Sequence, residues 1–115
     1  MNLIVVSGNL IKDGRVVRDK GMDIYKNTIA VYRDFNASGE SDFIDIVGFG
    51  HVGKYLRDYG RKGSYAILQG QLYTSKFVDS NGTKRRGFQI VVSKAKIINK
   101  VGNGSTEAEE DDELL

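Results

Sequence analysis

The chain has 115 residues, of which 40% are hydrophobic and 28% charged, the size and composition of one globular domain. Its net charge of +2 hides an uneven distribution, because all 17 Lys and Arg residues lie between Lys12 and Lys100, whereas six of the 15 acidic residues follow Thr106. A basic body with an acidic tail is typical of a polyanion-binding protein. A solubilising tail on a mildly basic domain would have the same composition.

The residue types that the chain lacks exclude several kinds of chemistry. With no cysteine, it has no disulfide, thiol catalyst or cysteine-ligated zinc, and the single histidine, His51, removes most histidine metal sites and triads. Asp42 and Asp45, three residues apart in a predicted strand, face opposite sides, so we expect no enzymatic activity and no cofactor. The longest early apolar run, Leu3–Val6, is too short for a signal peptide or membrane span, so we expect a cytoplasmic protein.

The first part of the chain predicts two strands. The β-branched segment Asn2–Leu10 is the first, and Ile11–Asp23, with mixed charges and two glycines, is expected to be a loop or a frayed hairpin. The second strand is predicted over Ile24–Arg33. Asn36–Ser41 is dense in turn-forming residues, so we expect a hairpin between the second strand and the next.

The centre of the chain predicts a strand followed by a short helix. The side chains of Asp42–Gly50 alternate as in a strand, which places Phe43 and Phe49 on one face and Ile44 and Ile46 on the other. The isoleucine face suits a barrel interior. The segment from residue 51 to residue 59 has apolar residues at helical spacing. We expect the two tyrosines of that stripe, Tyr55 and Tyr59, to pack in the core.

The last part predicts a long hairpin. Ser64–Val78 is expected to be a strand broken by Gly70, at a bulge or a barrel corner. Asp79–Gly82 is a strong turn signal, since Asn and Gly readily adopt positive φ. Gly87–Asn99 is predicted as the fifth strand, with Phe88 in the core.

Five strands with one short helix between the third and the fourth indicate an all-β fold, a five-stranded Greek-key barrel of the OB type. Beyond Val101 the composition shifts to Gly, Asn, Ser and acids, which bury too little surface to fold. We therefore divide the chain into an OB-fold domain, residues 1–100, and a flexible, disordered linker with an acidic C-terminal tip, residues 101–115. This fold is a candidate binder of oligonucleotides or oligosaccharides, but it does not by itself choose a function.

Two nucleotide-binding patterns occur where the helix begins. Gly48–Gly53 matches G-x-G-x-x-G, and with Lys54 it matches the phosphate-binding G-x-x-x-x-G-K until Tyr55 replaces the required Ser or Thr. No acidic residue lies near Gly70, where a ribose-binding carboxylate is expected, and no βαβ units follow. We interpret the glycines as ending a strand and starting a helix in little space.

Four phenylalanines lie near charged or amide side chains: Phe35, Phe43, Phe49 and Phe77. Phe77 adjoins Lys76 and is predicted to lie opposite a basic run, Lys84–Arg86. Exposed rings among cations suit single-stranded nucleic acid, because unpaired bases stack on rings while Lys and Arg contact phosphates. The alternative is that each ring is in the core, as most phenylalanines are.

From Asn2 to about Asn99 the chain resembles the OB-fold single-stranded-DNA-binding proteins of bacteria and phages. Six segments occur in the family's order: Gly8–Asp13 (GNLIKD), Thr28–Val31 (TIAV), Asp42–Gly50 (DFIDIVGFG), Tyr59–Ser64 (YGRKGS), Gln69–Leu72 (QGQL) and Lys76–Asp79 (KFVD). No single segment is specific, but six in the right order are. Asp13-Gly14 replaces the family's Asp-Pro.

The resemblance implies sequence-nonspecific binding and protection of single-stranded DNA during replication, recombination and repair, in the cytoplasm of a bacterium or a phage-infected host. It also implies a homo-oligomer, most often a tetramer. Bases would stack on the same four phenylalanines; family members often have Trp at three of these positions, so Phe predicts a smaller stacking surface. The resemblance places phosphate contacts at Arg33, Lys62, Lys76, Lys84, Arg85, Arg86 and Lys12.

The end of the chain also resembles the family, whose bacterial members close with Asp-Asp-x-Pro-Phe or similar. The resemblance implies a tip that docks on replication and recombination proteins through carboxylates and an apolar end. Here the tip consists of Asp111, Asp112, Glu113, Leu114 and Leu115. The short linker, roughly Lys100–Ala108, indicates a phage, plasmid or otherwise compact member.

Two other functions stay open on the sequence. The first is an OB-fold protein-interaction or replication-restart factor, in which DNA binding is secondary. The second is a nucleotide-dependent enzyme built on the glycine pattern.

Overall fold

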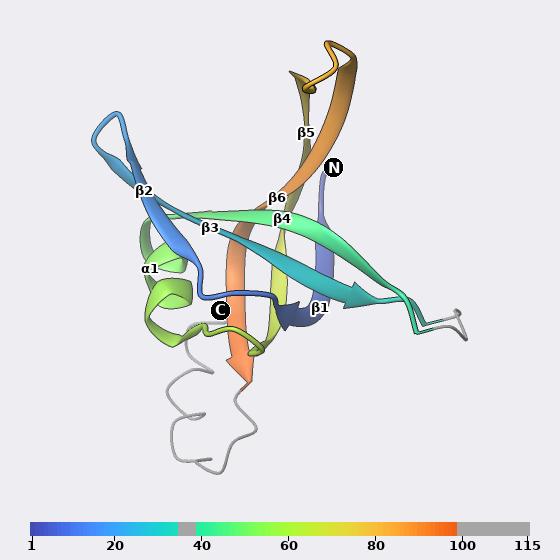
Figure 1. The fold of residues 1–115 in the computed structure, drawn as a ribbon. Helices are drawn as coiled ribbons and strands as arrows, with labels where there is room; N and C mark the ends of the chain where they lie inside the picture. The colour runs from blue at the N-terminus through green and yellow to red at the C-terminus, as the bar shows by residue number, and fades with distance from the viewer. Residues whose placement is uncertain (35–38, 99–115) are drawn as a thin grey trace.

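The computed structural model describes residues 1–34 and 39–98 (Figure 1). Its elements, in chain order, are β1 (Ile4–Leu10), β2 (Arg15–Asp19), β3 (Met22–Tyr32), β4 (Ser41–Phe49), α1 (Gly50–Tyr59), β5 (Tyr65–Val78) and β6 (Lys84–Ile98). The prediction of an all-β protein with a short helix after the third barrel strand is confirmed.

Five of these six strands close into a barrel. The sheet order is β1-β5-β6-β4-β3-β2, and β1 also pairs with β3, at Leu10 with Ile29, which closes the ring. The pairings are antiparallel except for β4 with β6, which is parallel. A closed sheet of this kind with a Greek-key connection is the OB-type architecture.

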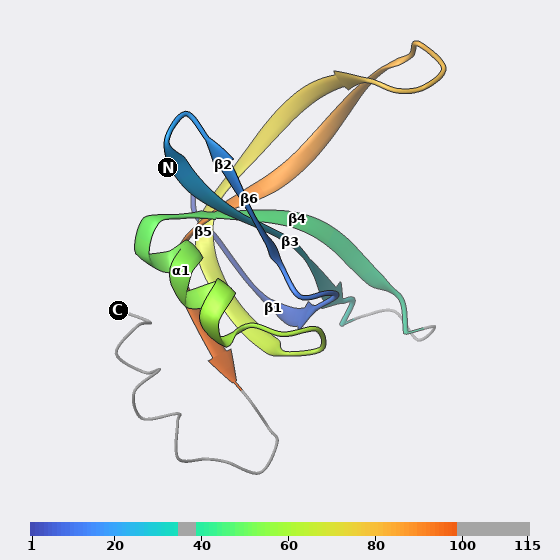
Figure 2. The same ribbon diagram turned by 60° about the vertical axis from the view of Figure 1, so that its left-hand side comes forward.

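The sixth strand, β2, extends the sheet outside that ring. It lies in the segment predicted to be a loop or frayed hairpin, and it pairs with the first half of β3 (Figure 2). Lys20 and Gly21 connect the two strands, both with positive φ (52° and 78°), as a tight two-residue hairpin turn requires. The hairpin alternative was therefore the right one.

The core lies inside the barrel and receives side chains from the barrel strands and the helix. Alternation on β3 buries Tyr25, Asn27 and Ile29, and alternation on β4 directs Ile46 inward, as predicted. Leu56 of α1 is also fully buried. The opposite positions of β3 and β4 are thereby turned outward.

The glycines at the start of α1 allow the helix to pack closely against the preceding strand, as interpreted from the sequence. A Cβ on Gly53 would lie 2.5 Å from the carbonyl oxygen of Gly48, so the helix packs directly on the strand before it. Tyr55 is buried, and its hydroxyl accepts a hydrogen bond from the Ile97 N–H at 2.9 Å. The prediction for Tyr59 is wrong: its side chain is 47% exposed, because it lies at the last residue of the helix.

A long β5–β6 hairpin projects from the barrel (Figures 1 and 2). Within the barrel the two strands shift register between Gln69 and Gly70, where a Cβ on Gly70 would lie 2.1 Å from the Val91 carbonyl oxygen. The predicted irregularity at Gly70 is thus present, but β5 continues through it unbroken, and the residue that the register skips is Ser93 on β6. The predicted turn is also present: one carboxylate oxygen of Asp79 accepts the N–H groups of Asn81 and Thr83, each at 2.9 Å.

Candidate nucleic-acid interface

The outward positions of β3, β4, β6 and β5 form one surface, which we call the outer face. The pairing register places one residue from each strand in a single row across it: Thr28, Asp45, Gln89 and Tyr73. Paired residues share a face of a sheet, and so do residues two apart along a strand. Other members of the outer face therefore follow from the register.

Three of the predicted rings lie on this outer face. Phe43 and Phe49 lie at the two ends of β4, with 67% and 39% of their side chains exposed, and Phe77, at 51%, lies four residues beyond Tyr73 on β5. A core position is therefore excluded for these three. Phe35 lies outside the described residues.

Phe77 leans back along the hairpin toward the barrel. A Cβ added to Gly87 would lie 3.3 Å from an edge carbon of the Phe77 ring. Gly87 pairs with Ser75, two residues before Phe77, so it lies on the barrel side of the ring. The glycine leaves room for the ring to lie over the strand, and about half of Phe77 stays exposed.

The prediction of a core position for Phe88 is wrong. Its side chain is 56% exposed. It has the inward parity of β6, but it lies on the projecting hairpin, where neither face of the two strands covers a core. It pairs with Thr74 next to the pair Lys76 and Arg86, on the face opposite Phe77.

The comparisons with known proteins agree with this geometry. The sequence profile described as "Single-strand binding protein family" matches residues 1–98. The chain belongs to this family. The single-stranded DNA-binding protein of Clostridium perfringens is 33% identical over 106 residues, covering 90% of this chain and 69% of the relative. That of Fusobacterium nucleatum is 31% identical over 114 residues, covering 93% and 73%, and single-stranded DNA-binding protein 2 of Streptococcus agalactiae serotype V is 31% identical over 107 residues, covering 83% and 80%.

Two of the predicted phosphate-contacting cations are engaged by carboxylates in the structure. The Arg33 guanidinium contacts both oxygens of Asp42, the shortest contact being 2.6 Å, and Glu40 at 3.1 Å. Arg85 Nε donates to Asp79 at 2.9 Å. These hydrogen bonds lower the pKa of Asp42 and of Asp79, so both arginines are partly neutralised within the protein.

The other predicted cations make no ion pair with any residue in the described ranges. On the hairpin, the β5–β6 pairing places Phe77 opposite the run Lys84–Arg86, as predicted, but the side chains of Lys76, Lys84 and Arg86 lie on the face of Phe88 and only Arg85 shares the face of Phe77. Lys62 follows the helix, where its backbone N–H donates to the Asp13 carboxylate at 2.7 Å. Lys12 lies at a groove that the sequence did not predict.

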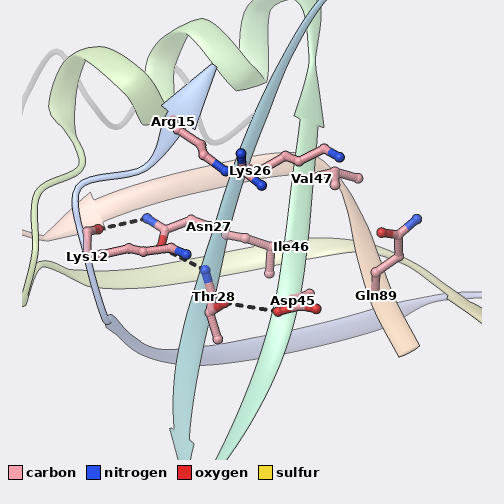
Figure 3. A pocket seen from close by; sticks show the side chains of 9 residues that line it. All are labelled: Lys12, Arg15, Lys26, Asn27, Thr28, Asp45, Ile46, Val47 and Gln89. Atoms are coloured by element: carbon pink, nitrogen blue, oxygen red, sulfur yellow. Dashed lines mark hydrogen bonds between the residues drawn. The ribbon is translucent and has the colours of Figure 1, made fainter. Parts of the chain in front are cut away.

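This groove has a volume of about 340 Å³ and lies between the β1–β2 connection, β2, β3, β4 and β6 (Figure 3). Two of its cations, Arg15 and Lys26, were absent from the predicted site. The signal that could have found Lys26 is its outward parity on the second predicted strand, two residues before Thr28. Arg15 was missed because its segment had no assigned strand.

Clusters of metal ligands and membrane-spanning helices are both absent from residues 1–34 and 39–98. No group of three or more His, Asp or Glu side chains in those ranges is placed to hold a metal ion. Their helix is also too short and too polar to cross a membrane.

Proposed function

We propose that this protein binds single-stranded DNA without sequence preference, stacking bases on the exposed rings of its outer face. The observation that carries the proposal is the position of Phe43, Phe49 and Phe77, three exposed rings on one surface of an OB-type barrel. Every base offers a π-face, so stacking of this kind tolerates any sequence.

Phosphates would be contacted by the cations around this surface. The strongest candidates are Lys76, Lys84 and Arg86, which lie on the other face of the hairpin and make no ion pair within the described residues, with Lys62 and Lys12 at the barrel. Arg33 and Arg85 would first have to exchange their carboxylate partners for phosphate. Each phosphate neutralised releases counterions, so we expect binding to weaken steeply with salt.

The cellular role follows from the family and not from the barrel itself. We propose that the protein protects single strands during replication, recombination and repair, in the cytoplasm, as a homo-oligomer with a tetramer favoured. The acidic tip, residues 111–115, would recruit partner proteins. That tip and Phe35 lie outside the described residues, so these proposals depend on the sequence alone.

The deciding experiment is a titration of labelled oligo-dT, and separately of its duplex with oligo-dA, followed by fluorescence anisotropy at two salt concentrations. A label is needed because the chain contains no Trp. We expect tight, salt-weakened binding to the single strand alone. Equal binding to the duplex would reduce the basic body to a general polyanion surface, and no binding to either would favour a protein-interaction or replication-restart factor.

A pair of aromatic variants then tests the surface. Phe49→Ala should cost about 1–3 kcal/mol of binding free energy, the usual contribution of one stacked base. The control is Tyr59→Ala, which removes an exposed ring from α1, outside the outer face, and should leave affinity unchanged. If Phe49→Ala bound as wild type while fully folded, Phe49 would not be a stacking residue.

A further inference from the structure

The groove in Figure 3 brings together three cations from separate elements: Lys12 from the β1–β2 connection, Arg15 from β2 and Lys26 from β3. Arg15 and Lys26 are directly paired between β2 and β3. Paired residues of an antiparallel ladder share a face, with their Cβ atoms about 5 Å apart. The two cationic side chains are therefore held side by side by the backbone.

These three cations differ from most arginines of the molecule in having no acidic partner among residues 1–34 and 39–98. Arg18, Arg33, Arg57 and Arg85 each lie within 3.1 Å of a carboxylate oxygen. The three groove cations make no such contact with any residue in the described ranges. The one carboxylate lining the groove, Asp45, has an oxygen that accepts the Thr28 hydroxyl at 3.0 Å. Three like charges beside one carboxylate leave a net positive groove that attracts an anion.

A buried amide fixes the wall of the groove. The Asn27 side chain is only 4% exposed, and its nitrogen donates to the Lys12 carbonyl oxygen at 2.9 Å and to the Tyr25 hydroxyl at 2.7 Å. A Cβ on Gly14 would lie 2.3 Å from the Tyr25 ring, so the β1–β2 connection rests directly on the core. The backbone that carries Lys12 and leads into Arg15 is thus anchored before any ligand arrives.

The groove also has a defined place relative to the rings. Lys26 pairs with Val47, and Val47 lies between Phe43 and Phe49 among the outward positions of β4. At about 3.3 Å per residue, Phe43 and Phe49 are separated by about 20 Å along the strand, and Lys26 is about 7 Å from the Phe49 row. A strand whose bases stacked on both rings would carry its backbone past these cations.

We propose that Lys12, Arg15 and Lys26 form a phosphodiester-binding site for the stretch of single strand between bases stacked on Phe49 and Phe43. Arg15 can contact two phosphate oxygens at once, while the two lysines act as point charges. The site rests on the proposed function, since its ligand is the backbone of the same DNA. Free inorganic phosphate has the same chemistry and is the competing occupant.

The test compares two triple variants that remove the same charge. Lys12→Gln with Arg15→Gln and Lys26→Gln empties the groove of cations, whereas Arg18→Gln with Lys20→Gln and Lys54→Gln removes three cations elsewhere. For each protein, oligo-dT affinity is measured against salt concentration, with circular dichroism to confirm folding. Each phosphate contact on a single strand contributes about 0.7 to the slope of log K against log salt, so the groove variant should lose about 2 from the slope and the control less than half of that.

Equal slopes for the two triple variants would overturn the site. That result would leave the proposed function standing, because single-strand binding is established first with the unmodified protein and stacking is tested separately by Phe49→Ala. Binding of inorganic phosphate in the absence of DNA, at constant ionic strength, distinguishes the occupants. We expect wild type and groove variant to bind phosphate equally weakly, and phosphate binding that the groove substitutions abolish while the two DNA slopes stay equal would assign the groove to free phosphate instead.

Discussion

The two faces of the β5–β6 hairpin carry similar residue types in different electrostatic settings. On the outer face, Phe77 lies near Arg85, whose charge is taken up by Asp79. On the opposite face, Phe88 lies next to Lys76 and Arg86, neither of which has an acidic partner in the described ranges. Only the first of these faces continues onto the barrel and its two other rings. We infer that, on the hairpin, the outer face provides stacking and the opposite face provides charge.

The largest expected difference is between the two rings. Phe77→Ala should cost about 1–3 kcal/mol of binding free energy, because Phe77 belongs to the same surface as Phe43 and Phe49. Phe88→Ala, which removes a slightly more exposed ring from the other face, should change oligo-dT affinity less than threefold. Anisotropy titrations of both variants in the same low-salt buffer measure the difference.

The distinction between the two hairpin faces would be wrong if Phe88→Ala weakened oligo-dT binding as much as Phe77→Ala or more. An affinity loss with Phe88→Ala that equals or exceeds the loss with Phe77→Ala would mean that bases stack on both faces, or on the opposite face alone. Thermal melts of both variants are the control, since neither ring is in the core and both proteins should unfold like wild type.

A smaller effect is expected from releasing Arg85. Asp79→Asn keeps the side-chain oxygen that accepts the Asn81 and Thr83 N–H groups but removes the charge that holds the guanidinium. A freed Arg85 would give the outer face a cation, so oligo-dT should bind more tightly at low salt, with a slope steeper by about 0.7.

Asp58→Asn is the matched control for this change. It removes one carboxylate that pairs with an arginine, Arg57, on α1, outside the outer face. Both variants gain the same net charge, so a gain in affinity shared equally by the two would be a general charge effect and would argue against a role for Arg85.

The phenylalanines show when the alternation of residues in a strand predicts burial and when it does not. Ile44 and Ile46 revealed which side of their strand faced the interior, and Phe43 and Phe49 were therefore placed correctly on the other side. The same logic failed for Phe88, because the strand continues beyond the barrel and both of its faces meet solvent. Parity shows which residues share a face, whereas burial depends on whether another layer covers that face.

The charges were harder to predict, because they depend on side-chain geometry across strands. Each arginine in the basic list looked equally available in the sequence, yet Arg33 and Arg85 are held by carboxylates nine and six residues away. The groove was missed for another reason: it needs the β2–β3 register that sets Arg15 beside Lys26. The glycines were interpreted correctly because the missing Ser or Thr and the absence of βαβ units both argued against a nucleotide site.

The smallest expected effect is on stability at low pH. It concerns the Asp79–Arg85 pair, which the Phe77 face of the hairpin has and the Phe88 face lacks within the described residues. The hydrogen bond from Arg85, with help from the Thr83 N–H, lowers the pKa of Asp79 in the folded protein, whereas an unfolded Asp titrates near about 3.9. The stabilisation is therefore fully present above about pH 4 and is lost as the pH falls through the folded-state value. We expect wild type to melt slightly above Asp79→Asn at pH 7, and this gap should close as the pH falls below 3.9. A gap that stays constant between pH 7 and pH 2 would show that the Asp79–Arg85 contact contributes nothing to stability and that Arg85 is already available to DNA.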